Sequence, residues 1–311
     1  MLFCQIGWHT VCVAVSQSKI LFFNGTNCSI IIGIFKTLRT HERLEGNRDF
    51  IRLLQITDTH LFSDEQGSLL GVNTLDSFRA VVDVVRQETQ SFDAVIATGD
   101  LSQDHTTESY RRFVDGISLI DKPCYWLPGN HDNQPEMQQI LAVKPMVKAS
   151  TVLLGEHWQM VLLDSQVPGV PYGELSEQEL DNLCTALDAY PERYTLILMH
   201  HHSVLAGSAW LDQHRLKNAD IFWQRVANYP NVKAVVGGHI HQALDNVHQG
   251  VRVMASPSTC VQFKANSDDF ALDNSNPGWR WLELHADGEL VSDVERLNGC
   301  QFKPDMLSSG Y

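Results

Sequence analysis

The sequence predicts an α/β fold from residue 51 to the C-terminus, and two observations predict it. Short apolar runs alternate with amphipathic stretches, the order that is typical of strands alternating with helices in a layered architecture. No internal repeat, low-complexity tract or Pro/Gly-rich linker divides this part of the sequence. We therefore expect residues 47–311 to form one domain.

The candidate strands are eight short apolar runs. In chain order they are 51–57 (IRLLQIT), 93–98 (DAVIAT), 124–127 (CYWL), 158–163 (WQMVLL), 194–199 (YTLILM), 232–236 (VKAVV), 251–254 (VRVM) and 281–284 (WLEL). Helices are predicted between them where apolar residues recur at helical spacing. These residues are Leu75, Phe78, Val81, Val82 and Val85 for one helix, and Leu180, Leu183 and Leu187 for another.

Charge and cysteine content narrow the class of protein. The 311 residues include 23 Lys and Arg against 37 Asp and Glu, which gives a formal net charge of -14. A chain of this charge repels a phosphate backbone, so we expect no nucleic-acid partner. Seven cysteines without a C-x-x-C pair do not form the disulfide framework of a small secreted protein, and they favour the reducing cytoplasm.

Residues 1–46 differ in composition from the rest of the chain and contain Cys4, Cys12 and Cys28. Two apolar patches, LFCQIGWHTVCVAV and SIIIGIF, raise the alternatives of a signal peptide or an anchor. Both are shorter than the roughly 20 apolar residues that span a bilayer, and no basic residue precedes the first patch. We interpret this stretch as a leader outside the domain, or as translated sequence upstream of the true start, and expect no membrane association.

Residues with metal-binding side chains follow five of the candidate strands. They are Asp58 and His60 after the first, Asp100 after the second, Asn130, His131 and Asp132 beyond the third, His200 after 194–199, and His239 and His241 after 232–236. In open α/β sheets the ligand site lies beyond the carboxyl ends of the strands, so these tails can converge on one crevice. In an extended strand end, residues two apart would face the same ion.

Each motif alone has a structural alternative, such as a turn Asp, an ordinary Gly-Asp turn or a hydrogen-bonded histidine pair. A metal site would be absent only if all of these alternatives were true together, at the carboxyl ends of five strands. Imidazoles, carboxylates and an amide oxygen without a thiolate suit Fe, Mn or Zn. The set is too large for one tetrahedral ion, but it suits two ions that share a bridging carboxylate.

The order D-x-H, G-D, G-N-H-D, H and G-H-x-H resembles the calcineurin-like metallophosphoesterases. The resemblance covers about residues 51–311, and stretches such as LQITDTHLF, ATGDLSQD, WLPGNHD and LLDSQVPGVPYGELSE are similar to the bacterial 3',5'-cyclic AMP phosphodiesterases of that family. It implies two mixed β-sheets packed as a sandwich and flanked by helices, in four layers α/β/β/α. It also implies hydrolysis of cyclic AMP to 5'-AMP by two divalent ions, Fe or Mn, with Zn or Mg as alternatives.

The resemblance, carried over residue by residue, also implies roles for individual side chains. Asp58, His60, Asp100 and His241 would hold one ion, and Asp100, Asn130, His200 and His239 would hold the other, with Asp100 as the bridge. A hydroxide between the ions would attack phosphorus in line. The expected substrate contacts are His60, Asp100, Asn130, His131 and His241.

His131 is the expected acid for the 3'-oxygen leaving group, because it neighbours Asn130 and is not itself assigned to a metal ion. Asp132 is expected either to orient His131 or to bond the backbone of its own turn.

Three alternative functions are compared with this pattern. A Ser/Thr protein phosphatase typically carries GDxxDRG and GNHE, whereas this chain has GDLSQD and GNHD. A phosphodiesterase of broader specificity is compatible with the motifs, because they specify metal chemistry and not the base. A catalytically silent metal-binding module is the third alternative, and a metal analysis with a turnover assay separates it from an enzyme.

Two further expectations concern the neighbourhood of the motifs. In MHHHS (199–203) strand alternation predicts that His201 points away from the site, while His202 lies on the side of His200. Trp210, His214 and the segment 256–263 (SPSTCVQF) are hypothetical contacts of adenine. The alternative is that Trp210 and Phe263 are ordinary core or lid residues.

Overall fold

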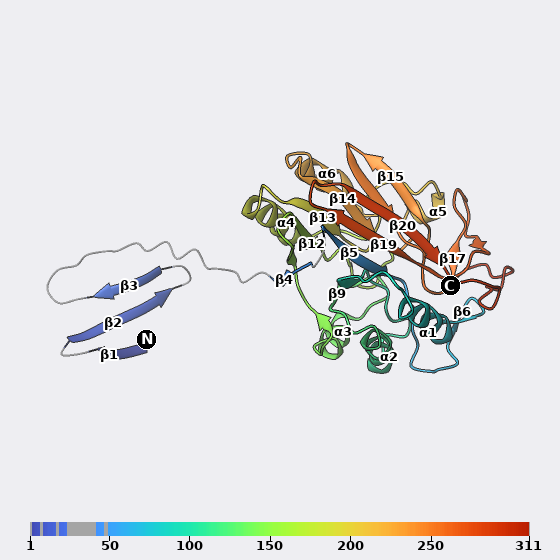
Figure 1. Ribbon diagram of the computed structural model, residues 1–311, viewed down its shortest axis with the longest axis horizontal. Helices are drawn as coiled ribbons and strands as arrows, with labels where there is room; N and C mark the ends of the chain where they lie inside the picture. Colours follow the sequence, from blue (N-terminus) through green and yellow to red (C-terminus); the bar gives the residue numbers. More distant parts are fainter. Residues whose placement is uncertain (1, 7–8, 17–18, 24–41, 47–48, 311) are drawn as a thin grey trace. The chain divides into compact units, whose positions relative to one another are not determined.

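The computed structural model describes residues 2–6, 9–16, 19–23, 42–46 and 49–310, in two compact units that divide between residues 41 and 42. The first unit is a three-stranded antiparallel sheet in the order β1-β2-β3 (Figure 1). Its strands are β1 (Leu2–Ile6), β2 (His9–Ser16) and β3 (Lys19–Phe23).

A six-stranded mixed sheet carries the first three predicted tails. Its order is β10-β9-β8-β5-β19-β20, in which β5, β8, β9 and β10 are parallel while β19 and β20 run antiparallel to their neighbours. Its strands are β5 (Phe50–Ile56), β8 (Ala94–Ala97), β9 (Cys124–Trp126), β10 (Met146–Val147), β19 (Gly278–His285) and β20 (Leu290–Arg296).

A seven-stranded mixed sheet carries the other two tails. Its order is β15-β16-β14-β13-β12-β11-β4, with β12, β13, β14 and β16 parallel at its centre. Its strands are β4 (Glu42–Leu44), β11 (Thr151–Leu154), β12 (Trp158–Leu162), β13 (Tyr194–Leu198), β14 (Val232–Gly237), β15 (Leu244–His248) and β16 (Val251–Ala255). β4 pairs with β11 and belongs to the second unit, which begins at residue 42.

Helices cover the outer face of each sheet (Figure 1). The apolar stripe of α1, with Phe78 and Val82 at its centre, packs on the six-stranded sheet, and the stripe of α4, with Leu180 and Leu183, packs on the seven-stranded sheet. Asn73 caps α1 by accepting a hydrogen bond from the amide of Asp76. The helices are α1 (Thr74–Val85), α2 (Thr107–Ser118), α3 (Gln134–Ile140), α4 (Glu177–Ala189), α5 (Ala209–Asp212) and α6 (Ala219–Val226).

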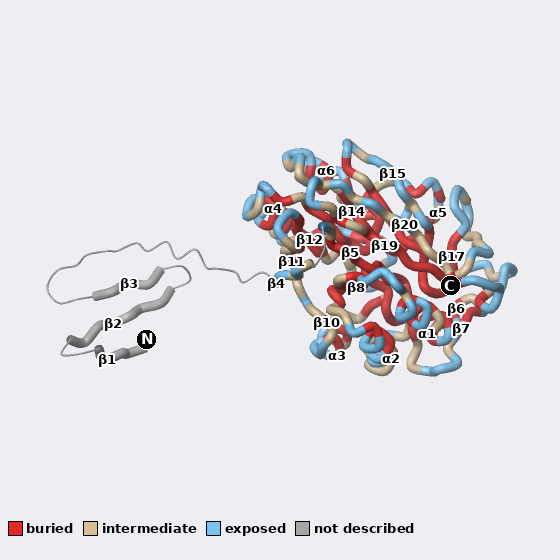
Figure 2. The backbone as a smooth tube through the Cα atoms, in the orientation of Figure 1, coloured by how far each residue is buried: buried red, intermediate tan, exposed pale blue. Residues whose placement is uncertain are grey.

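The middle of the unit is a buried apolar layer between the two sheets (Figure 2). Leu53 and Ile96 from the six-stranded sheet belong to it together with Met160, Leu196 and Ala234 from the seven-stranded sheet, and all five are fully buried. Two small hairpins complete the unit: β6 (Ser68–Leu69) with β7 (Val72–Asn73), and β17 (Gln262–Phe263) with β18 (Leu272–Asp273). The predicted α/β/β/α architecture is confirmed.

All eight predicted strands and both predicted helices are present, with ends that differ from the predicted ones by up to three residues. The strands of the second unit that the sequence did not predict are short or lie at sheet edges. At an edge one face is exposed, so the apolar signal in the sequence is weak; β15 is the clearest example. Within the described ranges, the helices are all too short or too polar to cross a bilayer.

Candidate metal centre

The five predicted tails converge at one place, and both sheets contribute to them. Asp58, His60 and Asp100 follow β5 and β8 of the six-stranded sheet, and His200 follows β13 of the seven-stranded sheet. His239 and His241 follow β14, and Asn130 follows β9. Six of these seven side chains are buried, and Asn130 is half-buried.

The backbone is left-handed at five of the seven predicted ligand positions, so the extended geometry expected at the strand ends is wrong there. The φ angles are 53° at Asp58, 45° at His60, 53° at Asp100, 69° at His239 and 48° at His241. Residues other than glycine adopt this region rarely and at a cost of about 1–3 kcal/mol, and such positions concentrate at functional sites. Side chains two residues apart therefore reach one centre through local turns and not through strand alternation.

Neighbouring loops hold this conformation in place. The amide of His60 donates to the carbonyl of Asp100 at 3.0 Å, which joins the tails of β5 and β8. Glycine is required beside them, because a side chain at Gly129 would collide with the Asp100 carboxylate and one at Gly238 would collide with that of Asp58.

The first cluster contains Asp58, His60 and His241, whose ligand atoms lie within 4.8 Å of one another. Nδ1 of His60 donates to Oε1 of Gln103 at 2.6 Å, and Nδ1 of His241 donates to the carbonyl of Val261 at 2.9 Å. In a neutral ring each of these bonds places the proton on Nδ1, which leaves the lone pair on Nε2. The two Nε2 atoms are 3.2 Å apart.

The second cluster contains His200, Asn130 and His239. Nδ1 of His200 donates to the carbonyl of Thr98 at 2.7 Å, and its Nε2 lies 3.1 Å from Oδ1 of Asn130. Nε2 of His239 is buried without a hydrogen-bond partner among the described residues. An imidazole nitrogen in this state is a typical metal ligand.

Asp100 stands between the two clusters. One oxygen, Oδ2, lies 3.2 Å from Nε2 of His200 and 3.9 Å from Nε2 of His60. The imidazole nitrogens and carboxylate oxygens of the two clusters point into two adjoining spaces. Divalent cations accept both kinds of atom as ligands. The residues present therefore fit two metal ions that share Asp100.

The charges of the buried groups agree with this assignment. Burial would raise the pKa of Asp100, but His200 and His131 hold it well below the usual range of an aspartate. Burial lowers the pKa of His60 to about 3, which keeps its ring neutral. Burial also acts to lower the pKa of His200, but Asp100 outweighs it and raises the pKa to about 9. A cation that binds His200 must therefore displace a proton.

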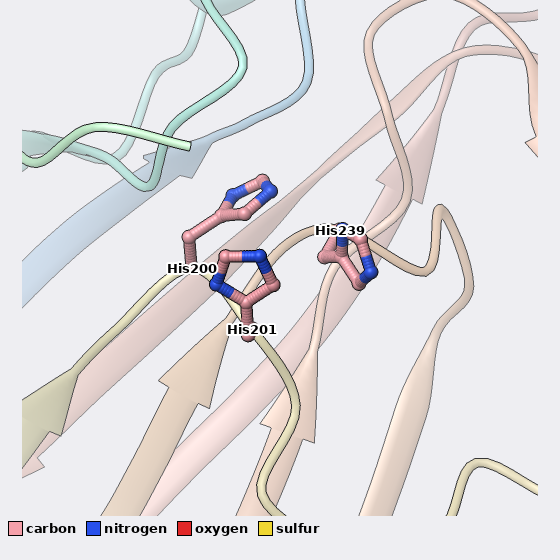
Figure 3. Close-up of side chains that lie close together, drawn as sticks. All are labelled: His200, His201 and His239. Carbon is pink, nitrogen blue, oxygen red and sulfur yellow. The ribbon is translucent and has the colours of Figure 1, made fainter. Parts of the chain in front are cut away.

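His201 does not point away from the site, so that prediction is wrong. Its ring centroid lies 4.9 Å from that of His200 and 4.8 Å from that of His239, and the three rings face one space (Figure 3). The chain bends at His200 and His201, which removes the alternation of an extended strand. Nδ1 of His201 is 2.8 Å from the hydroxyl of Ser165, and the ring of His202 stacks on His239 at 5.6 Å.

His131 and Asp132 occupy the loop after β9. The amide of His131 donates to Oδ1 of Asp100 at 2.8 Å, and its ring lies 5.0 Å from that of His60. The carboxylate of Asp132 accepts hydrogen bonds from the amides of Gly129, Leu101 and Ser102 and from the hydroxyl of Tyr110. These bonds tie the His131 loop to the Asp100 loop. The expectation that Asp132 orients the ring of His131 stays a prediction.

Two glutamines of the site had no role in the sequence analysis. Gln103 orients His60, and Nε2 of Gln166 donates to the carbonyls of Gly129 and Asp132, the two ends of the loop that carries Asn130 and His131. Glutamine is neither a common metal ligand nor an acid, so its type gives no signal. The signal is its position, because both residues stand shortly after a strand in polar stretches, GDLSQD and LLDSQ.

A cavity of about 1150 Å³ adjoins the second cluster. Asn130, His131 and His239 line it on the side of the metal ligands, and Trp210 and His214 line it from the segment around α5. The segment 256–263 does not line this cavity and packs against the first cluster. There the hydroxyl of Ser258 donates to the carbonyl of Asp58 at 2.7 Å, and Phe263 stacks on His241 at 4.4 Å.

The four-layer fold and the paired clusters that share one aspartate define a metallophosphoesterase. The chain belongs to the calcineurin-like phosphoesterase family, whose sequence profile matches residues 51–243. The predicted family is thereby confirmed, and the buried Asp and His clusters support a dinuclear metal centre.

Particular relatives are similar over most of their length. The chain is 57% identical over 261 residues to the 3',5'-cyclic adenosine monophosphate phosphodiesterase CpdA of Vibrio vulnificus, covering 84% of this chain and 95% of the relative. It is 51% identical to CpdA of Escherichia coli, with the same coverage. Among solved structures, a dimetal phosphatase from Danio rerio has a TM-score of 0.57 at 14% identity, covers 78% of this chain and 98% of that chain, and agrees in fold.

Proposed function

We propose that this protein hydrolyses 3',5'-cyclic AMP to 5'-AMP with two divalent metal ions. The observation that carries the proposal is the shared carboxylate, because Oδ2 of Asp100 reaches both histidine clusters beside a cavity large enough for a nucleotide. Relatives that are 49–57% identical and cover at least 84% of this chain are named as phosphodiesterases of this substrate.

The proposed ligands are those that the sequence predicts. Asp58, His60, Asp100 and His241 hold one ion, and Asp100, Asn130, His200 and His239 hold the other. When bound, the ions supply the Lewis acidity that activates water and neutralises charge on the phosphate. The family resemblance favours Fe or Mn, and Zn or Mg is tested beside them, because nitrogen and oxygen ligands accept each of these ions at a different affinity.

His131 is the proposed acid for the 3'-oxygen. Its ring lines the cavity next to the metal ligands, and its half-buried position lets it reach both substrate and solvent. His60, Asp100, Asn130 and His241 are the other proposed contacts of the substrate. We further propose that the enzyme acts in the cytoplasm on this small molecule, as its cysteine usage and acidic charge favour.

The test is hydrolysis of cyclic AMP by the purified chain, with apo protein compared with protein loaded with Fe, Mn, Zn or Mg. The product is identified chromatographically, since 5'-AMP and 3'-AMP separate. We expect 5'-AMP from the metal-loaded protein and no turnover by Asp100→Ala. Two bound metal ions without hydrolysis of cyclic AMP would refute the proposed substrate.

A further inference from the structure

The cavity beside the metal ligands has two chemically different ends. One end presents polar groups, Asn130, His131 and His239. The other presents Trp210, Leu211 and Phe270. Pro168, Val170 and Pro171 of the loop after β12 also line the cavity. A nucleotide divides in the same way, with a charged phosphate at one end and an apolar aromatic base at the other.

His214 links the two ends of the cavity. The ring of His214 lies 6.4 Å from that of His239 and 6.4 Å from that of Trp210, so it connects the metal side to the aromatic side. His214 and Trp210 are both half-buried and both line the cavity. A phosphate beside His239 would therefore leave the attached base within reach of Trp210.

The indole of Trp210 is held in a defined orientation. It packs edge to face with Phe263 at 5.0 Å and with Phe270 at 5.2 Å. Phe263 in turn stacks on His241, a proposed metal ligand. The aromatic end of the cavity is thus built onto the metal centre. A pre-positioned aromatic surface binds a planar base without an entropy cost for ordering it.

We propose that Trp210 is the stacking platform for the purine base of the substrate. The inference rests on the proposed function, because it names the part of the same site that recognises the base. His214 lies at the junction of base and ribose. Base–aromatic stacking strengthens binding by about tenfold or more in single-strand nucleic-acid sites, and we expect a similar size here.

The test compares 5'-AMP with ribose 5-phosphate, which lacks the base, by calorimetric titration of the manganese-loaded full chain. We expect wild type to bind 5'-AMP at least about tenfold more tightly. Trp210→Leu keeps an apolar side chain against Phe263 and Phe270 but removes the aromatic face, so the ratio of the two affinities should fall toward one. Trp210→Phe should retain most of it.

Tyr190→Leu serves as the matched control, because Tyr190 is a half-buried aromatic residue at the end of α4 and does not line the cavity. It should leave the ratio unchanged. The inference is overturned if wild type does not distinguish the two ligands, if Trp210→Leu keeps the wild-type ratio, or if Trp210→Phe loses as much as Trp210→Leu.

The experiments distinguish a failure of the proposed function from a failure of the proposed base site. A protein that discriminates 5'-AMP from ribose 5-phosphate through Trp210 but does not hydrolyse cyclic AMP has the base site without the proposed reaction. Hydrolysis of cyclic AMP that is accompanied by an unchanged ratio in Trp210→Leu leaves the function intact and removes Trp210 from base recognition.

Discussion

Nε2 of His60 and Nε2 of His241 face each other at 3.2 Å, and in the neutral rings both atoms present lone pairs, because each Nδ1 donates to a fixed acceptor. Two lone pairs at this distance repel each other unless a positive charge lies between or beside them. The carboxylates of Asp58 and Asp100 add negative charge to the same buried space. The centre is therefore built to gain stability from cations.

Removal of metal should destabilise the fold. A ligand at 100 times its Kd stabilises the native state by about 2.7 kcal/mol per site, which corresponds to a shift of several degrees in Tm. We expect a chelator to lower the Tm of wild type by that amount, and added Mn to restore it, as measured by calorimetry. Asp100→Asn should show little response to the chelator. A wild-type Tm that ignores chelation would contradict a metal centre here.

Substitutions in the histidine run after β13 should have two different effects on metal binding. His200→Ala should lose the second metal ion, because it removes a ligand at the shared carboxylate. Strand alternation would predict no effect for His201→Ala. Since His201 packs against both His200 and His239, we expect its loss to weaken metal affinity by about 10–100-fold, as changes around metal ligands commonly do. Metal titrations monitored by elemental analysis distinguish the two, and equal losses would argue that His201 is itself a ligand.

His131→Ala should reduce turnover of cyclic AMP by about 10²–10⁴-fold while both metal ions stay bound, because general acids contribute rate enhancements of this size. Steady-state kinetics and metal analysis on the same sample make the comparison. His157→Ala, an exposed histidine in the turn between β11 and β12, provides the control. If His131→Ala loses metal in proportion to activity, the acid role is wrong.

Asp104 should contribute stability that depends on pH. Although burial acts to raise it, hydrogen bonds from Ser63 and Thr106 lower the pKa of this carboxyl. A carboxyl with a lowered folded-state pKa stabilises the fold above its unfolded pKa of about 3.9, and this contribution disappears as the pH falls through the folded value. Asp104→Asn should therefore cost about 1 kcal/mol at pH 7 and progressively less below pH 4. Denaturant unfolding at a series of pH values measures this, and a constant difference would contradict it.

The seven predicted ligands, which the structure brings together, stand out in the sequence because each follows a strand that is a recognisable apolar run. The strands β5, β8, β13 and β14 are fully or nearly fully buried, so they are continuous apolar runs, and polar residues at their ends stand out. The two-sheet architecture follows from the family resemblance, but the strand pattern alone does not tell which tails belong to which sheet, since pairing partners are long-range.

The local geometry was harder to predict than the residue types. Strand alternation explains neither the left-handed backbone at Asp58 and His241 nor the inward position of His201. Tertiary hydrogen bonds, such as the one from the amide of His239 to the Asp58 carboxylate at 3.1 Å, determine these conformations. The same holds for Gln166, whose role depends on which loop lies beside it.

The rate of the reaction depends on residues that do not contact the substrate, because the metal ligands come from two different sheets. Asp58 follows a strand of one sheet and His241 a strand of the other, so the thickness of the apolar layer between the sheets sets how far apart these side chains stand. Close-packed interiors transmit small volume changes, and misplacement by about 1 Å can cost 10²-fold in rate. Leu53 and Met160 thus act as spacers for the chemistry, and a selection for altered turnover will recover substitutions in this layer as readily as in the cavity.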